Sequence, residues 1–152
     1  EGLLSMKATH AVTYNGQFSG PLNGAFWPVP EEIRRAINRL EGSEWYAVSL
    51  WALPPGKDVD QVPADFPDEY IQTAGRSDRL TVEIREVVNG VSIQQVIGRS
   101  TPAESGWETV AWDRFEVPVL KNELLTAADA VNLFLEYYES KQVPTGYNKR
   151  PR

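Results

Sequence analysis

Residues 81–98 read TVEIREVVNGVSIQQVIG, and they contain the clearest structural signal in the chain. Asn89-Gly90 predicts a two-residue β-hairpin, because both central positions of a type I′ turn need positive φ angles. Folding the strands about this turn pairs Val88 with Val91 and gives the hairpin one apolar and one mostly polar face. One buried and one solvated face is typical of antiparallel sheets. We expect the buried face to contain Val82, Ile84, Ile93 and Ile97.

Strand patterns also flank this hairpin. Residues 45–53, WYAVSLWAL, are apolar on both alternating faces, which indicates a central strand covered on two sides. Residues 7–14 predict a strand that ends at Asn15-Gly16. Residues 69–74 predict one strand before the hairpin, and residues 107–120 predict one or two after it. Together these patterns favour a twisted, mostly antiparallel sheet of about 5–7 strands.

Two helices complete the predicted fold. Within residues 30–41, apolar side chains recur at helical spacing, and Pro30 and Gly42 suit the two ends. Within residues 126–140, Thr126 and Asp129 have the spacing of a capping box. Phe134 and Tyr138 belong to the expected core stripe of this second helix.

The second helix carries more apolar residues than a surface helix needs, since Leu133 and Tyr137 lie beside its core stripe. Two interpretations are open. The helix lies in an internal groove that buries both side chains, or Tyr137 belongs to a partner surface, where tyrosine is over-represented.

Length and composition indicate one soluble α+β domain. The chain has 152 residues, no cysteine and a formal net charge of −6, which disfavours direct binding to nucleic acid or to anionic membranes. The absence of cysteine fits a cytoplasmic protein. No apolar run is long enough to cross a membrane. Because Met6 is the sole methionine, we interpret residues 1–5 as a cloning remnant and residues 6–152 as the domain.

Motifs for catalysis are absent from the sequence. His10 is the sole histidine, so it has no second histidine for a metal site, and no glycine-rich phosphate loop or nucleophile elbow occurs. We therefore expect no enzyme activity, no metal and no cofactor. A carboxylate-dependent hydrolase is the remaining catalytic alternative, with its acids drawn from Glu83, Glu86, Glu108 and Asp113.

Acidic residues cluster in KDVDQVPADFPDEY, residues 57–70, whose prolines and low apolar content predict a loop. Like charges in one loop gain little from each other and would gain from a basic partner. The predicted partner-binding residues are therefore those of this loop together with Tyr137: Asp58, Asp60, Asp65, Asp68 and Glu69. The alternative partner surface is the polar hairpin face, with Glu83, Arg85 and Gln94.

The C-terminal pattern NELLTAADAVNLFLEYYESKQVPTGYNKRP, residues 122–151, resembles small bacterial immunity proteins of polymorphic toxin loci. This family is often encoded beside deaminase toxins. The segment RLTVEIREVVNGVSIQQVIG is similar to the family's central hairpin, and EEIRRAINRL to its first helix. The positions that carry the C-terminal resemblance are Thr126, Ala127, Ala130, Phe134, Tyr137, Tyr138, Pro144, Gly146 and Tyr147.

This resemblance implies a protein that binds a cognate toxin domain and blocks its active site or substrate groove. The partner would be a protein, and the immunity protein would act in the cytoplasm. The acidic loop is compatible with that role, because toxins that act on nucleic acids need basic grooves. The alternative to this function is a non-catalytic small-ligand or scaffold domain.

Overall fold

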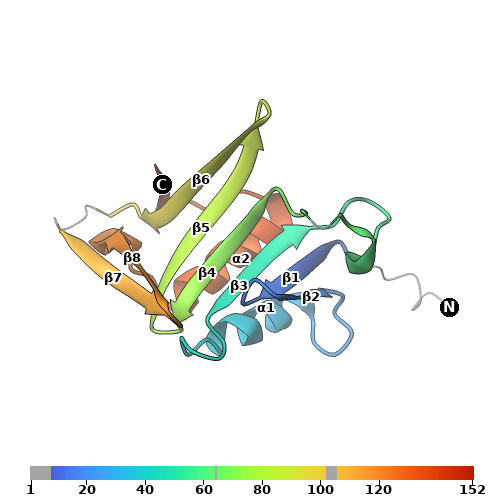
Figure 1. Ribbon diagram of the computed structural model, residues 1–152, viewed down its shortest axis with the longest axis horizontal. Coiled ribbons are helices and arrows are strands. Elements are labelled where there is room, and N and C mark those ends of the chain that lie inside the picture. The colour runs from blue at the N-terminus through green and yellow to red at the C-terminus, as the bar shows by residue number, and fades with distance from the viewer. Residues whose placement is uncertain (1–7, 64, 102–105) are drawn as a thin grey trace.

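The computed structural model describes residues 8–63, 65–101 and 106–152 (Figure 1). Residues 1–5 and Met6, on which the expected start of the domain depends, lie outside this part. The described residues form thirteen elements: β1 (His10–Tyr14), β2 (Phe18–Pro21), α1 (Val29–Asn38), β3 (Ala47–Ala52), the 3-10 turn η2 (Val59–Gln61), β4 (Tyr70–Arg76), β5 (Arg79–Val88), β6 (Val91–Arg99), β7 (Trp107–Trp112), β8 (Phe115–Leu120), the 3-10 turn η3 (Lys121–Glu123), α2 (Ala127–Ser140) and β9 (Tyr147–Pro151).

Seven strands form one antiparallel sheet in the order β2-β1-β3-β4-β5-β6-β9. Both helices cover the same face of this sheet (Figure 1). The protein is thus a single α+β domain with two helices, as the sequence predicts. Strand β9 was not predicted, and it takes the outer edge of β6 through pairs such as Ile97 with Lys149.

The hairpin β7–β8 corrects one expectation. Residues 107–120 do form two strands, but these make a separate two-stranded sheet instead of extending the main one. The physical reason is that β9 already occupies the edge of β6 on which a further strand would pair. The hairpin lies instead on the face that the helices leave open, where Trp107 and Val119 line one cavity with Glu83 and Val96.

The central hairpin has the predicted register. Val88 pairs with Val91, and the turn residues Asn89 and Gly90 have φ angles of 51° and 79°. Three of the four residues expected in the core are buried there: Val82, Ile84 and Ile97. The fourth expectation is wrong, since the side chain of Ile93 is 36% exposed. Ile93 pairs with Glu86 near the turn, and this end of the β5–β6 hairpin projects from the sheet (Figure 1).

The main core lies between the sheet and the helices. Helix α1 buries Ile33, Ala36 and Ile37, and it ends three residues before the expected limit at residue 41. Helix α2 begins after Thr126, whose backbone N–H donates to the Asp129 carboxylate at 3.0 Å. Its wide apolar arc is used internally: the buried residues include Leu133, Phe134 and Tyr137, while Tyr138 is partly buried against His10.

A smaller apolar cluster lies on the opposite face of the sheet. It is built on Ala11, Trp51 and Leu53, and Phe66 packs on the Trp51 ring with the ring centroids 5.5 Å apart. Val59 and Val62 also pack against this cluster. These contacts fold the segment between β3 and β4 back onto the sheet, so the acidic loop is anchored by its own apolar residues.

Candidate functional site

The acidic loop presents its aspartates to solvent. Asp58, Asp60, Asp65 and Asp68 are all exposed, and within the part of the chain that the structure describes none of them forms an ion pair. Elsewhere in the described residues eight carboxylates form ion pairs and seven do not, but no other run of unpaired acids is so dense; the paired ones are Glu31, Glu69, Asp78, Glu83, Glu86, Glu108, Glu123 and Asp129. The loop therefore carries concentrated negative charge that the described fold does not neutralise.

Glu69 has a different role from these aspartates, although it belongs to the same acidic run. One carboxylate oxygen accepts the Lys141 ammonium at 2.5 Å, and the other accepts the Val87 backbone N–H at 2.8 Å. These two donors hold the pKa of Glu69 below its ordinary value. Glu69 thus connects the acidic loop to α2 and to β5, and both of its oxygens are used within the protein.

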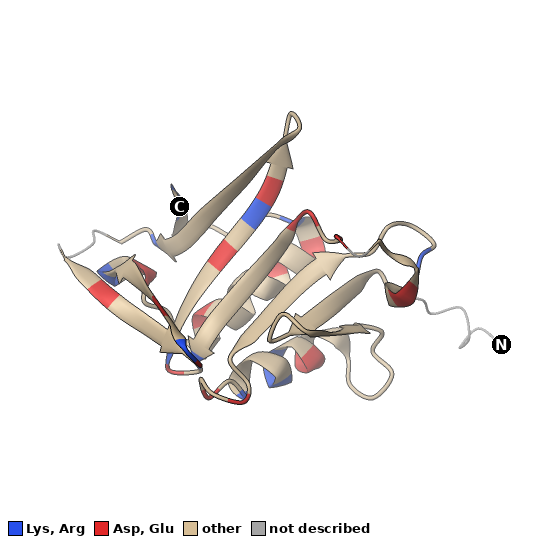
Figure 2. Ribbon diagram, in the orientation of Figure 1, with Lys and Arg blue, Asp and Glu red and all other residues tan. Residues whose placement is uncertain are grey.

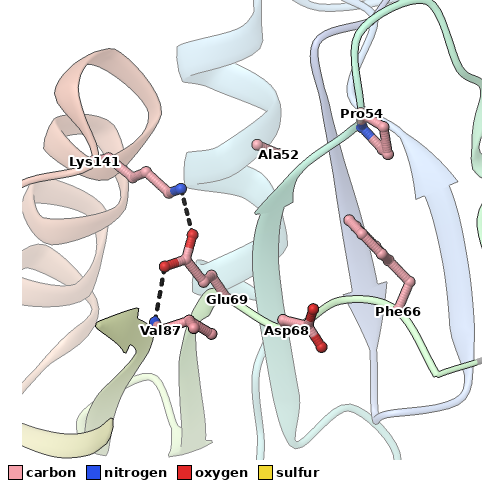
Figure 3. Close-up of a pocket in the computed structure, with 7 residues that line it drawn as sticks. All are labelled: Ala52, Pro54, Phe66, Asp68, Glu69, Val87 and Lys141. Carbon is pink, nitrogen blue, oxygen red and sulfur yellow. Dashed lines mark hydrogen bonds and ion pairs between the residues drawn. The ribbon is translucent and has the colours of Figure 1, made fainter. Parts of the chain in front are cut away.

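A groove of about 490 Å³ opens beside Glu69. Figure 3 shows Lys141 and Val87 bonded to Glu69, with Phe66 and Pro54 across the opening from them. Ala52 and Asp68 complete the lining. The groove therefore combines an apolar wall with a charged rim, and its lining includes residues of the acidic loop, the β5–β6 hairpin and the end of α2.

We call the projecting end of the β5–β6 hairpin, residues 86–93, the arm. It exposes four β-branched side chains: Val87 at 37%, Val88 at 47%, Val91 at 61% and Ile93 at 36%. Residues 87–98 contain no charged side chain, and the tip of the hairpin is correspondingly tan in Figure 2. Beyond Glu86 the arm is thus uncharged and apolar, and its base is bonded to the end of the acidic loop at Glu69.

The residues of the alternative polar surface of the hairpin lie together, as expected, but their side chains are bonded to other groups of the protein. Glu83 is only 8% exposed, and its carboxylate accepts the Gln94 amide at 2.7 Å and the Arg152 guanidinium at 2.9 Å. Arg85 donates to the Asp68 carbonyl at 3.1 Å and to the Ser92 hydroxyl at 3.0 Å. These side chains therefore hold the base of the arm in place, and most of their polar groups are already bonded within the protein.

Tyr137 does not belong to an exposed surface. Its side chain is 2% exposed, so the hypothesis that it contacts a partner is wrong for this conformation. Burial raises the pKa of its hydroxyl, and the nearby negative charges of Glu69 and Glu86 raise it further. Tyr137 therefore lies beneath the base of the arm, near the end of the cover that α2 provides.

The acids considered for a hydrolase do not converge. Glu83 and Glu86 are three residues apart on β5 and so point to opposite faces of the sheet. Glu86 pairs with Lys149 and Glu108 with Arg79, while Asp113 occupies the β7–β8 turn. Among the described residues, no group of three or more metal-ligating side chains is found, and no helix has the length and apolarity to cross a bilayer.

Comparisons with known proteins add no assignment. The sequence matches no protein-family model and no curated protein.

The sequence predicts the acidic loop and the hairpin but not the bond between Glu69 and Val87 that joins them. The arm did carry a sequence signal, namely the twelve uncharged residues from 87 to 98. Alternation alone predicts that Ile93 is buried with Ile97 on one face, because it does not reveal where the cover of that face ends.

Proposed function

We propose that this protein is an immunity protein that binds a toxin domain and blocks its active site or substrate groove. The observation that carries the proposal is the acidic loop, with four exposed aspartates that form no ion pair among the described residues. The resemblance of residues 122–151 to immunity proteins supplies the biological class. We place the protein in the cytoplasm, where such a toxin would have to be neutralised.

Charge and rigidity both favour binding to a basic groove. A negative loop attracts a basic partner during diffusional encounter and raises the association rate. The loop is also anchored, because Phe66 packs on Trp51 and Glu69 is bonded to Lys141 and Val87. An anchored loop loses less conformational entropy when a partner binds, so more of the interaction energy contributes to affinity.

The test begins with the gene neighbourhood. We expect a gene for a large secreted toxin beside the gene for this protein, and the C-terminal toxin domain should be expressed with its own catalytic residue inactivated. Isothermal titration calorimetry should then show a 1:1 complex with a Kd in the nanomolar range or below, roughly −12 kcal/mol. Adding the protein to the active toxin domain should abolish its activity at equimolar concentration. Absence of binding to the adjacent toxin domain would overturn the proposal.

The groove beside Glu69 supports a second candidate function, namely that of a domain that binds a small ligand. Its volume of about 490 Å³ falls within the range of about 300–1,000 Å³ that is typical of ligand pockets. The two functions differ in what stabilises the protein. A small-ligand domain should gain thermal stability in a screen of metabolites, whereas an immunity protein should gain it from the toxin domain.

A further inference from the structure

The apolar face of the β5–β6 hairpin continues past the end of its cover. Near the base, Val82, Ile84 and Ile97 are at most 1% exposed against the helices. Further along the same face, Val88 and Val91 are 47% and 61% exposed. Since alternate residues of a strand share one face, Glu86 and Gln95 also lie on it, between the buried and the exposed apolar residues. The face is therefore apolar in the core and apolar again at the tip, with these two polar residues between.

Exposed strands of soluble proteins normally carry features that prevent unwanted pairing. Charged side chains, prolines and bulges are the usual ones. The arm has none of these between residues 87 and 93, where the sequence is VVNGVSI. The pairing of β6 with β9 begins only at Gln95, so the outer edge of Val91, Ser92 and Ile93 has no strand partner in the described chain. Such a surface is typical of a site that another protein covers.

The base of the arm is held on both sides. On one side Glu69 accepts the Val87 N–H, and on the other Lys149 pairs with Glu86 at 3.4 Å. Arg85 adds a link from the Asp68 carbonyl to the Ser92 hydroxyl. A projection fixed at its base is preorganised for insertion, because little freedom is lost when it enters a cleft.

We infer that the arm is the anchor of the toxin interface: its tip inserts into an apolar cleft whose rim is basic. This inference rests on the proposed function and assigns the partner's chemistry from the surface itself. The uncharged tip suits an apolar floor, while the acidic loop, which is bonded to the base of the arm through Glu69, suits a positive rim. On this model the loop determines the association rate of the toxin complex, and the arm determines its dissociation rate.

The decisive variant is the double substitution Val88→Thr and Val91→Thr. Threonine keeps the β-branched shape that strands favour, so the hairpin should fold normally. We expect the dissociation rate of the toxin complex to rise about tenfold or more, with the association rate changed less than about twofold and with no dependence on salt. The matched control is Phe18→Thr on the opposite edge strand β2, where Phe18 is 63% exposed, against 61% for Val91. This control should leave both rates unchanged.

Surface plasmon resonance with the catalytically inactive toxin domain gives both rates, and urea unfolding confirms that each variant is folded. If the wild-type protein binds but the double variant dissociates at the same rate, the arm is not the anchor, although the proposed function stands. If the wild-type protein does not bind, both proposals fall. If the wild-type protein alone sediments as a dimer and the double variant sediments as a monomer, a second copy of this chain covers the arm and the toxin does not.

Discussion

The carboxylate of Glu69 accepts the backbone N–H of Val87 at 2.8 Å, so the end of the acidic loop is bonded to the start of the arm. The same carboxylate pairs with Lys141 at the end of α2. Three segments that are far apart in sequence thus meet at one side chain. This arrangement keeps the loop and the arm in a fixed relation, which a bipartite interface requires.

Replacement of Glu69 by glutamine should show a pH-dependent effect on stability. At pH 7 the variant should lose about 0.5–1 kcal/mol of unfolding free energy, because it lacks the charge that attracts Lys141. The pKa of Glu69 is lower in the folded protein than its ordinary value of 4.5. The ionised form therefore stabilises the fold above that value, and this contribution is lost as the pH falls through the folded-state pKa.

Urea unfolding of both proteins from pH 7 to pH 3 measures this effect. The difference between them should shrink steadily below pH 4.5, the ordinary pKa of a glutamate. A difference that is constant over the whole range would mean that the charge of Glu69 does not contribute to stability.

The turn of the arm should depend on its glycine. Gly90 has a φ angle of 79°, where a side chain is disfavoured, so Gly90→Ala should cost about 1–2 kcal/mol. Gly20 is the control, since its φ is not in the positive range and no atom lies within 4 Å of an added Cβ. Gly20→Ala should be neutral or slightly stabilising. Equal urea midpoints for the two variants would contradict the type I′ turn.

Phe134 should be a major contributor to the core. Its side chain is fully buried between α2 and the sheet, so Phe134→Ala should cost about 3–5 kcal/mol. The exposed Glu139 on the same helix provides the comparison, because Glu139→Ala should change stability by about 0.5 kcal/mol or less. A loss below about 1 kcal/mol for Phe134→Ala would mean that α2 does not bury this stripe.

Tyr137 offers a test of its hydroxyl separately from its ring. The hydroxyl is buried and has no hydrogen-bond partner among the described residues. Removing an unsatisfied polar group relieves its desolvation cost, so Tyr137→Phe should be neutral or should stabilise the protein by up to about 1 kcal/mol. Thermal or urea unfolding measures the change. Clear destabilisation would reveal a polar partner, such as a bound water.

Local signals predicted the parts of the fold that local chemistry determines. The Asn89-Gly90 turn and the start of α2 at Thr126 both follow from backbone requirements within a few residues. Strands β2 and β9 were missed, because FSGP and YNKRP are short and contain proline, which argues against a strand. They form because neighbouring strands supply their hydrogen bonds.

The candidate surface was only partly predictable for a related reason. Glu69 could not be distinguished from the aspartates beside it, since Lys141 lies 72 residues away along the chain. Ile93 matched the alternation of a buried face, but the cover that α2 (residues 127–140) provides does not extend to it, since Ile93 is 36% exposed. Alternation thus predicts which residues share a face and leaves the extent of the cover undetermined.

The acidic loop should control the rate at which the toxin domain associates. Replacing Asp58, Asp60, Asp65 and Asp68 together by asparagine should leave the fold intact, because exposed charges contribute little to stability. At about 20 mM salt the association rate should fall about tenfold or more, since steering by the loop is lost. At about 0.5 M salt the two proteins should associate at similar rates, because the Debye length is then only a few ångströms.

Net charge alone could slow association, so the control must remove the same charge elsewhere. Four exposed acids outside the loop serve this purpose when changed to their amides: Glu44, Asp113, Glu116 and Glu139. Both quadruple variants lose four negative charges, but only the loop variant loses them from the acidic loop. If the loop steers association, the association rate at low salt should fall much more for the loop variant than for the control. Equal effects would assign the attraction to the overall charge, and no effect in either would remove the loop from the interface.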